Sequence, residues 1–139
     1  MLKDVVMKYY YEQDMNCAES MIRGANEYYG LGLDENAFHT LGGFGGGCCC
    51  GRFCGACAGG VAAVSNLYIH TRAHAEEKAR AHVKDFTEAF IERLGSDICA
   101  ELKEKYMDYS LERSRCHVTV EKAAVLLEEM ITKFREEDN

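Results

Sequence analysis

The chain has 139 residues, a length typical of one domain, and its 47% hydrophobic and 28% charged residues are typical of a folded protein. The formal net charge of −7 at pH 7 argues against a nucleic-acid-binding protein, because that function needs a basic face. There are eight cysteines, several times the ordinary usage, and no proline. The composition therefore predicts one folded domain over residues 1–139 that does not bind nucleic acid.

The apolar segments are too short for a signal peptide or a membrane span. The N-terminus has an early acid, Asp4, and no continuous apolar run. The most apolar segment, Phe53 to Ile69, contains glycines as well as Ser65 and Asn66. We therefore expect a cytoplasmic protein, in which thiols stay reduced and cysteines serve metal binding or redox chemistry.

Apolar residues recur at helical spacing along most of the chain, and no alternating strand pattern is present. In chain order, helices are expected up to about Tyr11, over Cys17 to Tyr29, from Asp34 to about Leu41, over Val61 to His70, over Ala73 to Leu94, after Ser96, and from about Cys116–Thr119 onwards. Asn16 is a candidate N-cap, and Gly30 and Gly95 are candidate helix ends. The pattern predicts an all-α fold, a compact single-domain bundle of six or seven helices.

Residues 42–60 interrupt the helical pattern. They hold nine of the thirteen glycines and five of the eight cysteines. Ordering such a glycine-rich loop is entropically costly, so contacts inside the fold or with a bound group must offset that cost. The loop is not a nucleotide site, since GxxxxGK[ST] is absent and a GxGxxG begun at Gly43 fails at Cys48.

Local metal or redox motifs are incomplete in this sequence. Cys54 and Cys57 form a CxxC, but no βαβ context and no second CxxC accompany it. His70 and His74 are four residues apart, one helical turn, and we interpret them as solvated side chains rather than ligands. His117, beside Cys116, is interpreted as a surface or loop residue.

Four cysteines fall at or near predicted helix N-termini: Cys17, Cys54, Cys99 and Cys116. The helix dipole and the free backbone N–H groups favour negative charge there, which predicts lowered thiol pKa values. Four such helix starts meeting at one place would suit an iron–sulfur cluster or zinc. The alternative is that these cysteines are small buried hydrophobic residues.

The chain also resembles a prokaryotic family of redox-active proteins with the signature C…CGAxxG…C…C. The matching residues are Cys17, the segment Cys54-Gly55-Ala56-Cys57-Ala58-Gly59, Cys99 and Cys116. The resemblance implies an all-α fold whose four signature cysteines form a redox or metal centre. The family is in turn similar to the N-terminal domain of split-Soret cytochromes, where four cysteines are associated with an iron–sulfur cluster.

The leading hypothesis is a redox protein that binds a [2Fe–2S] or [4Fe–4S] cluster through Cys17, Cys54, Cys99 and Cys116, for electron transfer or redox sensing with a partner protein. The sequence departs from the signature by adding four more cysteines, which are secondary candidate ligands: Cys48, Cys49, Cys50 and Cys57.

Three other hypotheses stay open. A metal-free thiol–disulfide protein would use Cys54 or Cys57 as the attacking thiolate. A trafficking module would hold Zn²⁺ or Cu(I) on its eight thiolates. A helical interaction domain would carry its cysteines incidentally. No substrate pocket or general base is evident, so no turnover reaction is assigned, and an oxidoreductase role and homo-oligomer formation also stay open.

Overall fold

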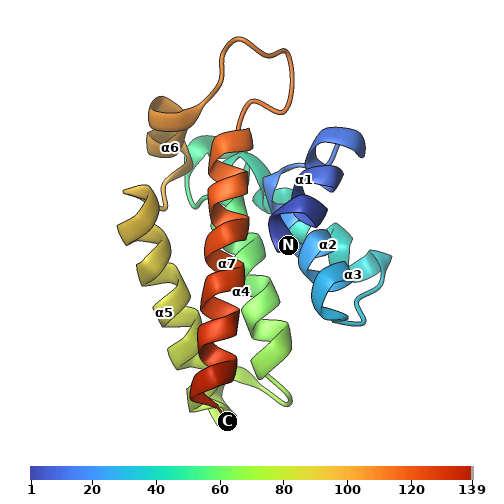
Figure 1. The fold of residues 1–139 in the computed structure, drawn as a ribbon, viewed down its shortest axis with the longest axis vertical. Coiled ribbons are helices and arrows are strands. Elements are labelled where there is room, and N and C mark those ends of the chain that lie inside the picture. Colours follow the sequence, from blue (N-terminus) through green and yellow to red (C-terminus); the bar gives the residue numbers. More distant parts are fainter. Residues whose placement is uncertain (139) are drawn as a thin grey trace.

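The computed structural model describes residues 1–138, and α-helices account for most of them (Figure 1). The seven α-helices are α1 (Leu2–Glu12), α2 (Cys17–Tyr29), α3 (Glu35–Leu41), α4 (Gly55–Tyr68), α5 (Glu77–Leu94), α6 (Cys99–Tyr106) and α7 (His117–Glu137). Short helical turns occur at η1 (Gly42–Phe44), η2 (Gly47–Gly51) and η3 (Ala73–Ala75). The described residues contain no strand, only an isolated bridge between Phe53 and Ile98. The predicted all-α fold with six or seven helices is confirmed.

Helix α2 has the ends that its sequence predicts. The Asn16 side chain accepts a hydrogen bond from the Glu19 N–H, and the Glu19 carboxylate accepts one from the Asn16 N–H, each at 3.0 Å. This reciprocal capping box satisfies two backbone donors at the helix start. Gly30 ends the helix at a φ of 65°, in the left-handed region that glycine adopts without strain.

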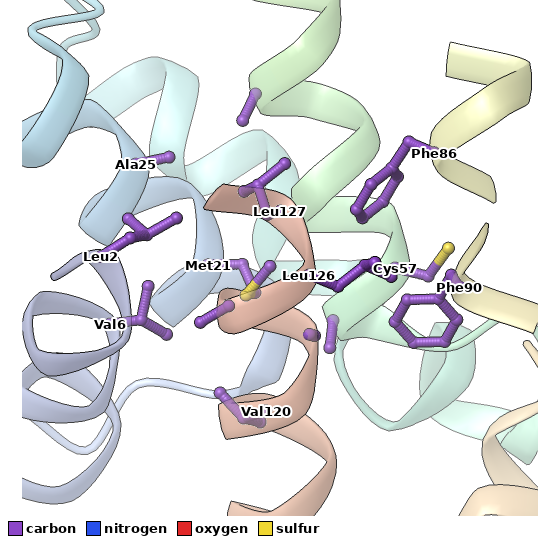
Figure 2. Packing of buried hydrophobic residues seen from close by; sticks show 14 of the residues in the cluster. Leu2, Val6, Met21, Ala25, Cys57, Phe86, Phe90, Val120, Leu126 and Leu127 are labelled. Carbon is purple, nitrogen blue, oxygen red and sulfur yellow. The ribbon is translucent and has the colours of Figure 1, made fainter. Parts of the chain in front are cut away.

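Helices α4 and α7 run through the middle of the molecule (Figure 1). Helix α4 packs against α2, α5 and α7, and α7 also contacts α1 and α5. The core between them includes fully buried side chains from four helices, α1, α2, α5 and α7: Leu2, Val6, Met21, Phe86, Phe90, Leu126 and Leu127 (Figure 2). A Cβ on Gly59 would lie 2.6 Å from the Met21 Cβ and 2.8 Å from the Ala18 carbonyl oxygen. Glycine at this position therefore permits the close approach of α2 and α4.

Three predicted helix boundaries are wrong. Helix α4 begins at Gly55, not Val61, so the loop predicted over residues 42–60 ends six residues earlier than expected. Its first turns are rich in glycine and alanine, and here close packing outweighs glycine's low helix propensity. Helix α5 begins at Glu77, not Ala73, and the N-cap of α6 is Ile98 rather than Ser96.

The two histidines expected one helical turn apart do not share a helix. Helix α4 ends at Tyr68, so His70 follows its C-terminus, while His74 lies in η3. The His70 N–H donates to the Glu76 carboxylate at 2.6 Å, which holds this connection in place.

No helix within residues 1–138 combines the length and the apolar character needed to cross a membrane.

Candidate functional site

The four signature cysteines begin four different helices. Cys17 and Cys99 are the first residues of α2 and α6, and Cys54 and Cys116 are the N-caps of α4 and α7. The prediction that all four lie at helix N-termini is therefore confirmed. At these positions the unpaired N–H groups of the first turn and the helix dipole both favour negative charge.

These four helix starts meet around one small cavity of about 30 Å³. Its lining consists of Cys17, Gly46, Cys54, Gly55, Cys99, Leu102, Lys103, Cys116 and Thr119. Cysteines separated by up to 99 positions in the sequence thus face the same space. The remaining lining residues are two glycines, one leucine, one threonine and one lysine.

Backbone hydrogen bonds hold three of the cysteines in position. The N–H of Cys54 donates to the Asp97 carbonyl at 2.7 Å, and the N–H of Cys99 donates to the Arg52 carbonyl at 2.6 Å. These two bonds tie the start of α6 to the segment before α4. The N–H of Cys116 donates to the Tyr10 hydroxyl at 2.9 Å, which links α7 to α1.

Glycines permit the close approach of backbone to these cysteines. A Cβ on Gly55 would lie 2.5 Å from the Cys17 sulfur and 2.8 Å from the Phe44 carbonyl oxygen. Gly47 has a φ of 63°, and a Cβ there would lie 2.6 Å from the Arg52 nitrogen. A side chain is excluded at both positions, which explains part of the glycine enrichment in this segment.

The thiol pKa values are raised, contrary to the sequence prediction. Burial raises the pKa of Cys54 to about 12, although N–H groups of Ala56 and Cys57 act to lower it. Burial is also the largest cause of the raised pKa values of Cys17, Cys99 and Cys116. Desolvation of a thiolate in this small cavity therefore outweighs the helix dipoles.

Two neighbouring side chains partly offset the effect of desolvation on the thiol pKa values. The positive charge of Lys103 lowers the pKa of Cys99 and of Cys116, each against a larger effect of burial. A hydrogen bond from Tyr10 acts in the same direction on Cys116. The cavity thus holds protonated thiols at neutral pH and offers partial compensation for negative charge on sulfur.

The other four cysteines do not border this cavity. Cys48, Cys49 and Cys50 are exposed on η2, where Cys48 and Cys49 have φ values of 59° and 61°. Cys57 has no exposed surface and belongs to the hydrophobic core, where Figure 2 draws it with Phe86 and Phe90. Of the eight cysteines, Cys57 is therefore the one best described as a small buried hydrophobic residue.

No group of three or more His, Cys, Asp or Glu residues within 1–138 is arranged to hold a single metal ion. A tetrahedral zinc site needs thiolate sulfurs about 3.8 Å apart, given Zn–S bonds of about 2.3 Å. His117 does not join the cysteines either, since its Nε2 pairs with the Asp108 carboxylate at 2.9 Å. All eight cysteines are free thiols.

Comparisons with known proteins give one match. The family described as "Putative redox-active protein (C_GCAxxG_C_C)" matches residues 15–130, a range that contains all eight cysteines. The motif in the family description reads Gly-Cys-Ala, whereas this chain reads Cys54-Gly55-Ala56 before Gly59. The comparison with curated proteins gives no match, and neither does the comparison with solved structures. Because the match covers most of its length, the chain belongs to this redox-active family.

Proposed function

We propose that this protein binds an iron–sulfur cluster through Cys17, Cys54, Cys99 and Cys116, and exchanges electrons with a partner protein or senses redox state. The observation that carries the proposal is the meeting of four helix N-termini, each bearing one of these thiols, around a single cavity. When bound, such a cluster accepts or donates an electron at a potential set by its surroundings.

The donor set suits a cluster better than a single metal ion. Four thiolates are the usual ligands of both [2Fe–2S] and [4Fe–4S] clusters, and a cluster joins thiolates that lie farther apart than those around one ion. The described residues form no group of three or more ligands around one ion, which argues against a tetrahedral zinc site at this place. Free backbone N–H groups at the helix starts would donate hydrogen bonds toward sulfur.

Binding requires movement of one wall and loss of the thiol protons. A volume of about 30 Å³ holds only a few water-sized spheres, less than a cluster needs. Gly46 and Lys103 also border an open surface groove, so they form the side of the cavity that can move outward. Because the thiol pKa values are raised, iron must displace protons from the cysteines as it binds.

A thiol–disulfide mechanism through Cys54 and Cys57 has less support. Cys57 lies fully buried in the core, and its burial raises the pKa of its thiol. A thiolate is the attacking species in disulfide exchange, and access to the sulfur is also required. Cys57 meets neither requirement in the folded protein.

The test is the iron and sulfide content of protein purified and reconstituted without air, together with its visible absorption. We expect brown protein with bound iron and sulfide. The Cys54→Ser variant should lose most of both, whereas Cys57→Ser should retain them. These two cysteines are matched in burial, at 4% and 0% exposure, but only Cys54 borders the cavity.

The triple variant Cys48→Ser/Cys49→Ser/Cys50→Ser is a second control, since these exposed thiols lie outside the cavity. It should bind the same amount of iron as the natural protein. Colourless, iron-free protein after reconstitution would contradict the proposal, as would loss of iron in the triple variant with retention in Cys54→Ser.

A further inference from the structure

A surface groove of about 220 Å³ lies beside the cysteine cavity. It shares four lining residues with that cavity, namely Cys17, Gly46, Lys103 and Cys116. The loop between α6 and α7, which spans residues 107–116 and arches over one end of the molecule in Figure 1, supplies much of the remaining wall. The groove is thus the solvent-facing side of the cysteine site.

The groove is basic in an acidic protein. Its lining includes Lys103, Arg113 and Arg115 and no carboxylate, although the chain has 23 acidic and 16 basic residues. None of these three cations takes part in an ion pair within the part of the chain that the structure describes. Three like charges around one hollow create a positive potential that favours an anion between them.

Only one of these cations also borders the cysteine cavity. Lys103 borders both the cavity and the groove, whereas Arg113 and Arg115 border the groove alone. The two arginines therefore present their positive charge to the groove alone, where no carboxylate of the lining neutralises it.

Two helix starts add to the attraction for an anion. Helices α2 and α7, of 13 and 21 residues, begin at Cys17 and directly after Cys116, both in the groove wall. Their N-terminal dipole ends add partial positive charge.

We infer that this basic groove binds a small anion with two or more negative charges, an oxyanion or a dicarboxylate, through Lys103, Arg113 and Arg115. The groove is smaller than the pockets that hold drug-sized ligands, so it suits a ligand of a few non-hydrogen atoms. Arginine suits this ligand class because its planar guanidinium can donate two parallel hydrogen bonds to one oxyanion. A role of this anion as a substrate or regulator of the redox centre rests on the proposed function. The binding of the anion does not depend on that function.

The test is titration of the metal-free, reduced protein with sulfate and with succinate, followed by calorimetry and backbone NMR shifts. Chloride keeps the ionic strength constant, so that non-specific screening does not change. We expect saturable binding of at least one anion, with shifts centred on residues 103 and 113–116. The Arg113→Gln/Arg115→Gln variant should bind at least tenfold more weakly.

The matched control is Arg72→Gln/Arg80→Gln, which removes two exposed arginines outside the groove and should change affinity less than twofold. Because the Arg115 Nε donates to the Leu111 carbonyl, Arg113→Gln alone serves if the double variant unfolds, and it should also weaken binding.

Absence of saturable binding for both anions, or equal affinity in groove and control variants, would overturn the inference. Iron and sulfide content after reconstitution should be the same in all variants, so a failure of anion binding stays distinct from a failure of cluster binding.

Discussion

Gly55 lies where any side chain larger than a hydrogen atom would clash with its surroundings. A methyl group there would lie 2.5 Å from the Cys17 sulfur and 2.8 Å from a backbone oxygen, that of Phe44, which cannot move without shifting η1. We expect Gly55→Ala to lower the free energy of unfolding of the metal-free protein by about 1–3 kcal/mol. It should also reduce iron retention, because Cys17 must shift.

Urea unfolding under reducing conditions measures the effect of Gly55→Ala. The control is Gly43→Ala, at a position where a Cβ meets nothing within 4 Å. Helix propensity and chain entropy both favour alanine over glycine, so an equal loss of stability in both variants would contradict the assignment of the loss at Gly55 to the contact with Cys17.

The Tyr10 hydroxyl is a buried hydrogen-bond acceptor for the start of α7. Tyr10 is 8% exposed, and its oxygen accepts the Cys116 N–H at 2.9 Å. Tyr10→Phe leaves this N–H without its partner, and we expect a loss of about 1–3 kcal/mol in the free energy of unfolding.

Tyr11→Phe is the matched control for Tyr10→Phe. Tyr11 is 43% exposed, and its hydroxyl makes no hydrogen bond to the described residues. Denaturant unfolding of the metal-free protein compares the two. A loss in Tyr11→Phe as large as that in Tyr10→Phe would contradict the assignment of the effect to the Cys116 N–H.

At the scale of elements, an ion pair joins α3 to α2. The Arg23 guanidinium donates to both carboxylate oxygens of Glu35, at 3.2 and 2.8 Å, and also lies over the Phe38 ring. The hydrogen bond from Arg23 lowers the pKa of Glu35 below its ordinary value of 4.5. A carboxyl whose pKa is lowered by folding stabilises the fold above its unfolded-state pKa and loses that effect as the pH falls through its folded pKa.

We therefore expect the difference in unfolding free energy between the natural protein and Glu35→Gln to shrink as the pH falls below about 5, where the Glu35 carboxylate takes up a proton. Denaturant unfolding at a series of pH values measures it. Glu136→Gln, which removes an exposed carboxylate on α7, should show no such trend. A difference that grows as the pH falls would have the wrong sign for this ion pair.

Helices with local signals were predictable from the sequence, and those without were not. The ends of α2 follow from Asn16 and Gly30, because a capping side chain and a left-handed glycine act within a few residues. The start of α4 does not follow, since its Gly-Ala-Cys-Ala-Gly-Gly segment has poor helix propensity and is helical only because α2 and α5 pack closely on it. Tertiary contacts of this kind leave no local periodic signal.

The same distinction applies to the cysteine site. Its four residues were identified from helix starts and from the family signature, and the structure places all four around one cavity. The direction in which their pKa values shift was predicted wrongly. The helix dipole follows from one helix, whereas the burial that raises these pKa values depends on the whole fold. The basic groove was missed altogether, since Lys103, Arg113 and Arg115 approach one another only through the path of the loop before α7.

At the scale of the whole molecule, the cysteines divide into three classes of accessibility. Cys48, Cys49 and Cys50 are exposed, the four cavity thiols range from half-buried to buried, and Cys57 has no exposed surface. A thiol reagent should therefore modify the three η2 cysteines first in reduced, metal-free protein. Cys57, enclosed between α4 and α5, should react only when the molecule unfolds globally.

Mass-spectrometric labelling over time, with and without urea, measures these classes. The rate of Cys57 modification should rise with urea in parallel with the unfolding equilibrium, whereas labelling of Cys48 should hardly change, because local opening of an exposed turn exposes little additional surface. The variant Phe86→Ala removes a fully buried ring beside α4 and should lower stability by about 3–5 kcal/mol. It should therefore accelerate Cys57 labelling by orders of magnitude while leaving Cys48 labelling unchanged.

Fast labelling of Cys57 in the stable native protein would show that α4 and α5 separate without global unfolding.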